Sequence, residues 1–187
     1  MSVWNSESAE WYAEHYGEYP TNRLGLDSLE LPPDATVVDI GCGTGSALRH
    51  ASDRVSHGIL IGVDPVARML EIARDQTMAH PAAARIAFRQ GAAEDLPIET
   101  ASADFVLAFD SFDHWQDQGR GLQEVHRILK PRGRFVIVKD LSLPYGREAQ
   151  DALVEALAEA RLEVLDTQIL EENDVKCKRW ICSIKPT

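Results

Sequence analysis

A turn with three alternating glycines constrains the fold of this chain more than any other feature. Residues 37–40 form a short, largely apolar run, followed by Gly41, Gly43 and Gly45. Glycine allows positive φ angles and lets a ligand approach the main chain, so the pattern indicates a buried strand that turns sharply into a helix. A second apolar run ends at Asp64, at a spacing that places a carboxylate beside a ribose. Together these features predict a nucleoside-containing cofactor at the carboxyl ends of parallel strands.

The residues around the turn favour one kind of nucleoside cofactor. Dinucleotide-binding folds use G-x-G-x-x-G or G-x-G-x-x-A, whereas Ser46 holds the last position of that pattern here. Asp39 places a carboxylate at the mouth of the turn, where a pyrophosphate needs backbone N–H groups and no nearby negative charge. A carboxylate at this position suits a cationic group, such as the ammonium of an amino acid.

The string D-x-G-C-G-T-G at residues 39–45 resembles motif I of the class I S-adenosylmethionine-dependent methyltransferases. Further segments resemble that family in the same order and at matching spacing, namely residues 64–74, 91–97, 105–115 and 128–133. An ordered set of motifs is far more specific than a single glycine motif. The resemblance implies S-adenosyl-L-methionine as the cofactor and favours a methyltransferase over an NAD-linked oxidoreductase.

The resemblance also implies how the first two motifs hold the cofactor. Gly41 and Gly43 let its methionine part lie against the backbone, and Asp39 holds its ammonium directly or through water. Asp64 accepts hydrogen bonds from both ribose hydroxyls. An alternative role for Asp64 is to cap the helix that follows it, and the two roles are compatible.

The adenine side of the site departs from the family pattern at one position. Family members often carry an acidic or amide side chain where this chain has Ala92, so backbone groups of Ala92 and Ala93 are left to bind the edge of the ring. Met69 matches the apolar position beside the adenine, although such a methionine is equally typical of a plain core. The residues expected at the cofactor site are Tyr12, Tyr16, Asp39, Gly41, Cys42, Gly43, Asp64, Pro65, Met69, Ala92, Ala93 and Asp110.

The first 31 residues are rich in aromatic side chains and resemble the flexible cap that covers the cofactor in small family members. Such a lid would exclude water and orient the acceptor. The alternative is a helix that packs through its aromatic face, and both can hold. The aromatics concerned are Trp4, Trp11, Tyr12, Tyr16 and Tyr19.

The segment 109–115 is the candidate for the reacting groups, because open α/β sheets place them beyond the carboxyl end of a strand. His114 is the candidate general base, since histidine ordinarily exchanges protons near neutral pH. The alternative is a residue that caps or packs against the next helix. Asp110, Asp113 and His114 are too close together on one loop, without a distant partner, to predict a metal site.

The alternation of apolar and amphipathic segments predicts an α/β, Rossmann-like, doubly wound sheet of seven mostly parallel strands with a reversed last strand. The chain of 187 residues suits a single methyltransferase domain, with a cap over 1–31 and a core over 34–187. The expected strands are 37–39, 59–63, 86–89, 105–109, 135–138, 164–170 and 175–184. The expected helices are 46–53, 66–78, 122–129 and 148–162.

Bulk properties exclude some classes of protein. The net charge of −11 disfavours sequence-independent binding of nucleic acid. Lys176, Lys178 and Arg179 form a small basic cluster, interpreted as the solvated edge of a strand. No apolar run approaches the length needed to span a bilayer, and three cysteines without metal-ligand spacing suggest reduced thiols and a cytoplasmic location.

These features predict an enzyme that moves a methyl group from S-adenosylmethionine to N, O or C of a small-molecule acceptor. The alternatives are a non-catalytic protein that only binds the cofactor, and a methyltransferase that acts on a macromolecule. The short cap leaves a shallow acceptor pocket, which motivates the expectation of a homodimer.

Overall fold

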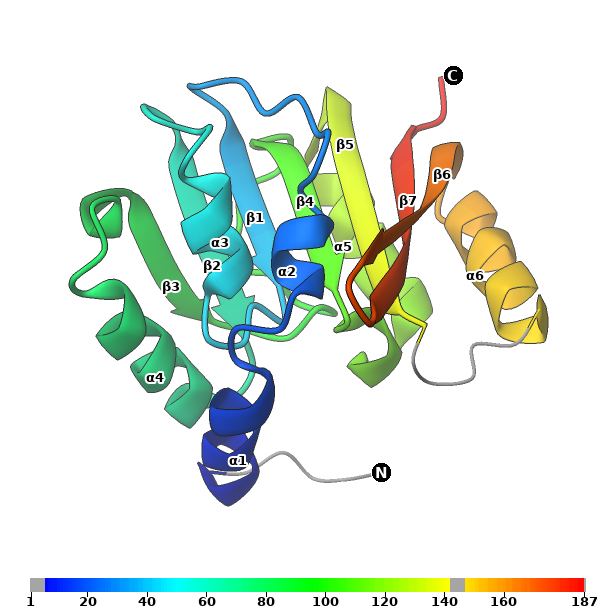
Figure 1. Ribbon diagram of the computed structural model, residues 1–187. Helices are drawn as coiled ribbons and strands as arrows, with labels where there is room; N and C mark the ends of the chain where they lie inside the picture. The colour runs from blue at the N-terminus through cyan, green and yellow to red at the C-terminus, as the bar shows by residue number, and fades with distance from the viewer. Residues whose placement is uncertain (1–5, 142–146, 187) are drawn as a thin grey trace.

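The computed structural model describes residues 6–141 and 147–186, and a sheet of seven strands forms its centre (Figure 1). The strands are β1 (Thr36–Ile40), β2 (Ile59–Asp64), β3 (Ile86–Gln90), β4 (Ala103–Phe109), β5 (Leu129–Asp140), β6 (Leu162–Glu172) and β7 (Val175–Ile184). They lie in the order β3-β2-β1-β4-β5-β7-β6, and all neighbours from β3 to β5 are parallel. β7 runs antiparallel to β5 and β6, which confirms the predicted mostly parallel sheet with a reversed strand.

Helices cover both faces of the sheet. The described α-helices are α1 (Ser6–Tyr16), α2 (Thr21–Leu24), α3 (Ser46–Ala51), α4 (Ala67–Thr77), α5 (Gln118–Ile128) and α6 (Arg147–Glu159), with short 3-10 helices η1 (Ala83–Arg85) and η2 (Phe112–His114). One apolar core joins the strands to α5 and α6, and a second joins them to α2 and α3 (Figure 1). No helix in the described ranges is long and apolar enough to cross a membrane.

The strand order reverses between β1 and β4. After β1 the chain continues to β2 on one side of the pair, and after β4 it continues to β5 on the other side. In open α/β sheets, such a switch point opens a crevice at the carboxyl ends of the strands. The glycine turn follows β1, and the segment with His114 follows β4. The fold therefore brings the two predicted functional segments to the same edge of the sheet.

The region between α5 and β5 differs from the expected boundaries. The helix begins four residues before the expected start at 122, because Asp117 caps it by accepting a hydrogen bond from the N–H of Arg120 at 2.9 Å. β5 then begins at Leu129, well before the expected start at 135. Leu129 pairs with Ala103, whereas Arg134 pairs with Phe105, so the intervening residues form a bulge that was expected to be a turn.

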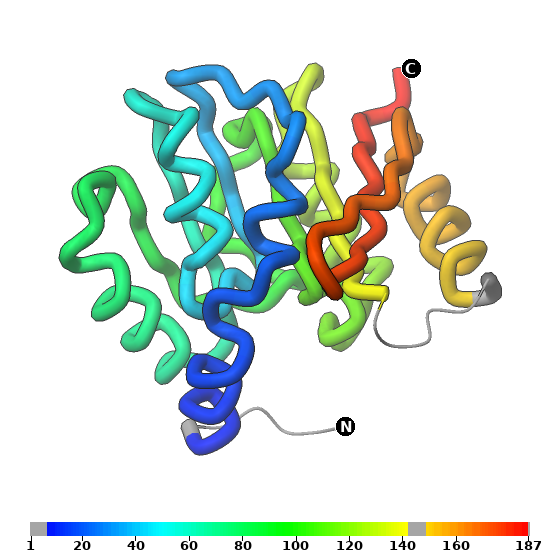
Figure 2. Tube along the Cα trace, in the orientation of Figure 1, coloured from blue at the N-terminus to red at the C-terminus, as the bar shows by residue number. Residues whose placement is uncertain are grey.

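The N-terminal cap follows the front of the sheet from α1 to the start of β1 (Figure 2). The hydroxyl of Thr44, in the glycine turn, donates a 2.6 Å hydrogen bond to the carbonyl oxygen of Gly17. Ser46 Oγ donates to Glu18 at 2.8 Å, and Arg68 on α4 pairs with Glu10 on α1. Polar contacts thus tie the cap to both helices beside the site. The expected cap residue Trp4 lies outside the described residues.

Arg179 corrects one sequence expectation. Its side chain is only 1% exposed, so it does not lie on a solvated strand edge. Its guanidinium donates to the carbonyl oxygens of Gly25 and Asp27 and to Gln168 Oε1. Burial lowers the pKa of this guanidinium from its ordinary value. The prediction of a solvated basic cluster is therefore wrong for Arg179, because the segment that follows α2 covers this part of β7.

Candidate active site

The glycine turn has the backbone geometry that its sequence predicts. Gly41, Gly43 and Gly45 have φ angles of 70°, 51° and 78°, which favour glycine over any residue with a Cβ atom. A Cβ at Gly41 would lie 2.5 Å from the Cβ of Ser111, so the turn after β1 and the segment after β4 are in close contact. The N–H groups of Gly41 and Cys42 both donate to the carbonyl oxygen of Val63, which fixes the turn against β2.

Asp64 connects the end of β2 to the glycine turn. Its Oδ2 accepts a hydrogen bond from the N–H of Gly43 at 3.2 Å, and its Oδ1 accepts one from the N–H of Val66 at 2.9 Å. Burial raises the pKa of Asp64 to about 6, against the lowering effect of these two N–H donors. The capping alternative is wrong, because the N-cap of α4 is Val66 and no side chain caps this helix; the bond from Val66 to Asp64 lies before its first turn. Carboxylate oxygens have further lone pairs, so these bonds leave acceptor capacity for a ligand.

A cavity of about 130 Å³ lies at the switch point between β1 and β4. Most residues expected at the cofactor site line it: Tyr12, Gly41, Gly43, Asp64, Pro65, Met69, Ala92, Ala93 and Asp110. We call this space the first cavity. Met69 is at once a cavity residue and a core residue, being 3% exposed. The roles of these residues toward a cofactor stay predictions.

Asp39 and Cys42 are not among the residues that line the first cavity. Asp39 is 2% exposed, and its pKa is raised to about 7, chiefly by burial and further by the charge of Asp64. The thiol of Cys42 lies against Gly62 and donates weakly to the carbonyl oxygen of Gly43 at 3.8 Å. Burial raises the pKa of Cys42 well above its ordinary value, so this residue has the character of a buried packing group.

Asp110 holds three parts of the structure together directly after β4. Its Oδ1 accepts from the N–H of Asp140 at 2.6 Å, and its Oδ2 accepts from the hydroxyl of Thr21 at 2.7 Å. Its φ of 52° lies in the left-handed region, which is uncommon for a residue other than glycine. Strained backbone of this kind clusters at functional sites. The fold therefore fixes this carboxylate where the cap, β4 and β5 meet.

His114 ends the short helix η2 and lines the first cavity and a neighbouring one. The side chain that caps α5 is Asp117, so the capping alternative for His114 was wrong. His114 therefore lies at the boundary of the two cavities. In the described residues, no group of three or more His, Cys, Asp or Glu side chains is placed to hold a metal ion.

A second cavity of about 220 Å³ shares Tyr12, Phe109, Asp110 and His114 with the first. Its remaining wall consists of Tyr16, Tyr19, Thr21, Asn22, Lys139 and Asp140. The structure thus places Tyr16, expected at the cofactor site, in the second cavity and not in the first. The two cavities meet at side chains from the cap and from the end of β4.

Several cavity residues were not predicted. Ser111 lines the first cavity, and its hydroxyl donates to the carbonyl oxygen of Ile40 at 2.5 Å. Trp115 also lines it, and its buried indole N–H has no hydrogen-bond partner among the described residues. A Cβ at Gly121 would lie 2.5 Å from the Trp115 ring, so only glycine fits here. The glycine inside an amphipathic helix was therefore the one signal in the sequence that could have indicated a closely packed side chain at this position.

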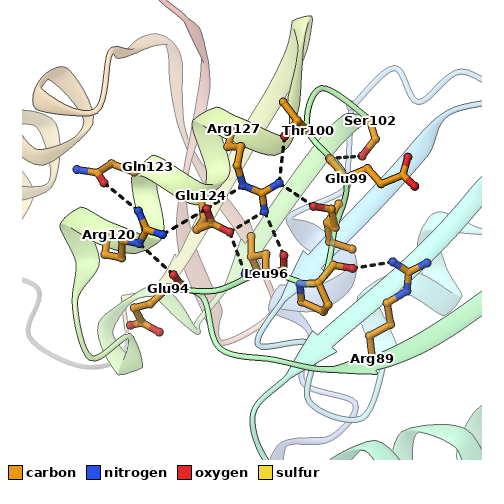
Figure 3. A network of polar contacts seen from close by, with 12 residues as sticks. Arg89, Glu94, Leu96, Glu99, Thr100, Ser102, Arg120, Gln123, Glu124 and Arg127 are labelled. Atoms are coloured by element: carbon orange, nitrogen blue, oxygen red, sulfur yellow. Dashed lines mark hydrogen bonds and ion pairs between the residues drawn. The ribbon is translucent and has the colours of Figure 1, made fainter.

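A network of polar contacts positions the segment that carries Ala92 and Ala93 (Figure 3). Glu124 on α5 is 4% exposed, accepts from the N–H of Leu96 at 2.9 Å and pairs with Arg127 at 2.6 Å. Arg127 also donates to the carbonyl oxygens of Leu96 and Ile98. Arg127 holds the pKa of Glu124 below its ordinary value, chiefly through the hydrogen bond between them. This network fastens the adenine-side segment to α5.

The first cavity suits a cationic nucleoside cofactor. Its wall, in the described residues, includes the carboxylates of Asp64, Glu94 and Asp110 and no lysine or arginine. A pyrophosphate would meet these charges without a compensating cation, whereas a sulfonium or ammonium would be attracted. Tyr12 has a pKa raised to about 12 by burial and by the charges of Asp110, Asp39 and Asp64. The charge of this wall therefore favours a cationic group over a pyrophosphate.

Fold and site together define an α/β domain of the kind that binds a nucleoside-containing cofactor, and comparison with known proteins gives its family. The family model described as "Methyltransferase domain" matches residues 38–137, more than half of the chain. The chain belongs to the class I S-adenosylmethionine-dependent methyltransferase family, whose cofactor is S-adenosylmethionine.

Relatives are found among C- and O-methyltransferases. The ubiquinone/menaquinone biosynthesis C-methyltransferase UbiE of Geotalea daltonii is 30% identical over 118 residues, which cover 63% of this chain and 50% of the relative. The O-methyltransferase cnsE of Penicillium expansum is 27% identical over 189 residues, covering 92% and 68%. A SAM-dependent methyltransferase structure from Aquifex aeolicus matches 97% of this chain and 100% of its own with a TM-score of 0.74 at 17% identity. The chain spans half or less of the first curated relatives it matches.

Proposed function

We propose that this protein transfers the methyl group of S-adenosylmethionine to a nitrogen, oxygen or carbon atom of a small molecule. The observation that carries the proposal is the pair of adjoining cavities, which share Tyr12, Phe109, Asp110 and His114. The first cavity takes the cofactor and the second takes the acceptor. The cofactor supplies an electrophilic methyl group, so the protein contributes mainly alignment and exclusion of water.

Each part of the first cavity has a proposed role. The backbone at Gly41 and Gly43 accommodates the methionine part, and Asp39 compensates its ammonium. Asp64 accepts hydrogen bonds from the ribose, while Pro65, Met69 and the backbone of Ala92 and Ala93 hold the adenine. Tyr12 covers the site from the cap, and His114 accepts a proton from the acceptor where the chemistry requires it.

Calorimetry with S-adenosylmethionine and S-adenosylhomocysteine tests the cofactor site. We expect micromolar binding, about −8 kcal/mol, to the native chain and a loss of at least tenfold in Asp64→Ala. Because Asp64 also holds Gly43 and Val66, Asp64→Asn is the second variant: it keeps the size of the side chain and one acceptor oxygen. Asp75→Ala, at an exposed position of α4, is the matched control and should bind like the native chain.

The outcomes separate the competing functions. No binding of either compound to the native chain would contradict the proposal. Binding without formation of S-adenosylhomocysteine, over a broad panel of acceptors, would favour the non-catalytic cofactor-binding protein. Thermal stabilisation by NAD, and not by the sulfonium compound, would favour an oxidoreductase.

The remaining expectations are also proposals. We treat residues 1–187 as a single methyltransferase domain and place the protein in the cytoplasm, where its three buried free cysteines would stay reduced. The net charge of −11 supports a small molecule over nucleic acid as the acceptor. The homodimer stays a prediction.

A further inference from the structure

Ser111 does not make the contact that its position in the chain favours. It directly precedes the short helix η2, where a serine side chain ordinarily accepts a hydrogen bond from the first N–H groups of the helix. Its side chain makes no such capping bond here. The hydroxyl instead donates at 2.5 Å to the carbonyl oxygen of Ile40, which lies 71 residues earlier at the end of β1. Tertiary structure, and not its own helix, therefore holds this side chain.

The hydroxyl of Ser111 keeps acceptor capacity for a ligand. A serine oxygen carries one proton and two lone pairs. The proton is used in the bond to Ile40, and within residues 6–141 and 147–186 no group donates a hydrogen bond to the lone pairs. A polar group that approaches this oxygen from the cavity must therefore be a hydrogen-bond donor.

Ser111 lies in the wall of the first cavity, against the glycine turn. It is 7% exposed and lines the first cavity but not the second. A Cβ at Gly41 would lie 2.5 Å from the Cβ and 3.1 Å from the Oγ of Ser111. The oxygen is thus beside the backbone that accommodates the methionine part of the cofactor in the proposed function.

The strand order separates Ser111 from the proposed ribose site. β1 lies between β2 and β4 in the sheet (Figure 1). Asp64 ends β2, whereas Ser111 follows β4, so the two residues lie on opposite sides of β1. In the proposed function, the ribose hydroxyls belong to Asp64 and the adenine to the segment of Ala92 and Ala93. The ammonium is the hydrogen-bond donor of the cofactor that is left for the side of Ser111.

The engaged proton of Ser111 also determines which end of the amino-acid part faces it. The cofactor carries an ammonium and a carboxylate on the same carbon atom. A carboxylate only accepts hydrogen bonds, and so does the Oγ of Ser111 once its proton is bound to Ile40. An ammonium donates three, and bonds from a charged donor are about twice as strong as those between neutral groups. The ammonium is therefore favoured at this oxygen over the carboxylate.

We propose that the Oγ of Ser111 accepts a hydrogen bond from the ammonium group of the bound cofactor and so orients its amino-acid part. This inference rests on the proposed function and adds a binding residue to it. The bond to Ile40 fixes the direction of the lone pairs before the cofactor binds. An acceptor that is already ordered loses little conformational freedom on binding, which favours affinity.

Calorimetry with two ligands that differ in one group tests this bond. The full chain is titrated at neutral pH with S-adenosylhomocysteine and with its deamino analogue, in which a hydrogen replaces the ammonium group. We expect S-adenosylhomocysteine to bind at least about tenfold more tightly than the analogue. Equal binding of the two ligands would overturn the assignment. Failure of S-adenosylhomocysteine itself to bind would instead overturn the proposed function.

Ser111→Ala locates the preference at this residue. The advantage of S-adenosylhomocysteine over the deamino analogue should fall at least about fivefold, while the analogue itself binds within about twofold of its native affinity. Equal weakening of both ligands would give Ser111 a structural role alone, and an advantage of unchanged size would place the ammonium elsewhere. Either result would overturn the proposal.

Two further variants complete the experiment. Ser52→Ala is the matched control, since Ser52 is 6% exposed, donates to the carbonyl oxygen of Arg49 at 2.6 Å and lines neither cavity. It should keep the full advantage. Ser111→Cys replaces the oxygen with a sulfur of weak acceptor strength and serves where the alanine variant does not fold. It should lose the advantage as well, and a full advantage in Ser111→Cys would contradict the proposal.

Discussion

At the scale of single residues, Asp39 and Asp64 could be identified from the sequence, but their places relative to the cavity could not. The motif spacing identifies both carboxylates, and both are buried at the carboxyl ends of β1 and β2. Asp64 lines the first cavity, whereas Asp39 does not. That difference depends on the path of the glycine turn between them, which residue spacing does not specify. Tyr16, expected at the cofactor site, lines the second cavity and not the first, since it lies one helical turn beyond Tyr12.

Asp39→Asn is expected to stabilise the cofactor-free protein above neutral pH. The pKa of Asp39 is raised from 3.8 to about 7, so the folded state holds a proton that the unfolded state has released. Stability from this group is full below pH 3.8, falls as pH rises toward 7 and is constant above that. The shift corresponds to at most about 4 kcal/mol. Urea unfolding at pH 5, 7 and 9 measures the gain, which should grow between pH 5 and 7.

The same variant should bind S-adenosylmethionine at least about fivefold more weakly, because an amide does not compensate an ammonium. Asp53→Asn, at an exposed position beyond α3, serves as the control and should change neither property. A variant that is less stable than the native chain at pH 9 would show that the Asp39 carboxylate is compensated within the fold.

At the scale of elements, the network of Figure 3 explains how a loop without regular structure is held in place. Glu124 and Arg127 lie on consecutive turns of α5 and fasten the chain at Leu96 and Ile98. The sequence predicts the helix from its apolar stripe. It does not predict that a glutamate on the helix is buried, because its partners lie far from it in the chain.

Glu124→Gln should destabilise the protein by about 2 kcal/mol, since it removes the charged partner of Arg127 and leaves a single acceptor oxygen where two now serve Arg127 and the N–H of Leu96. The pKa of Glu124 is lowered in the folded state, so its contribution is present above the ordinary value of 4.5 and is lost as pH falls below it. The difference between native chain and variant in urea should therefore narrow from pH 7 to pH 4. Glu155→Gln, exposed on α6, is the control. A difference independent of pH would contradict this account.

Element boundaries follow the sequence closely where apolar periodicity is strong. β2, β3 and α4 lie within a residue of their expected limits. β5 was expected to be much shorter, because Pro131 and Gly133 are typical of a turn. These residues form the bulge opposite β4. Pairing with β4, and not the preference of these residues for a turn, therefore determines where β5 begins.

At the scale of the whole molecule, the sheet and the position of the site could be predicted because both follow from the order of strands and helices. The second cavity could not. Its wall combines the cap with the ends of β4 and β5, from Tyr12 to Asp140, and only the assembled fold brings these together. The cavity proposed for the acceptor is therefore a product of tertiary structure.

The predicted homodimer is tested by sedimentation or light scattering on the full chain. A dimer would have twice the chain mass of 20.8 kDa and would dissociate on dilution. The motivation is the short cap, in which Trp11 and Tyr16 are 54% and 40% exposed. A monomer at every concentration that also methylates a small acceptor would remove the prediction.

The contact of Arg179 with the cap also affects how the chain folds during translation. The guanidinium of Arg179 donates to the carbonyl oxygens of Gly25 and Asp27. Arg179 follows these residues in the chain by 154 and 152 positions. A ribosome adding about 5 to 20 residues per second needs roughly 8 to 30 seconds to cover that separation. Throughout that interval, the emerging cap lacks its contact with β7. A nascent chain arrested before β7 should accordingly be cut by protease within residues 17–35, and release of the finished chain should abolish that cleavage.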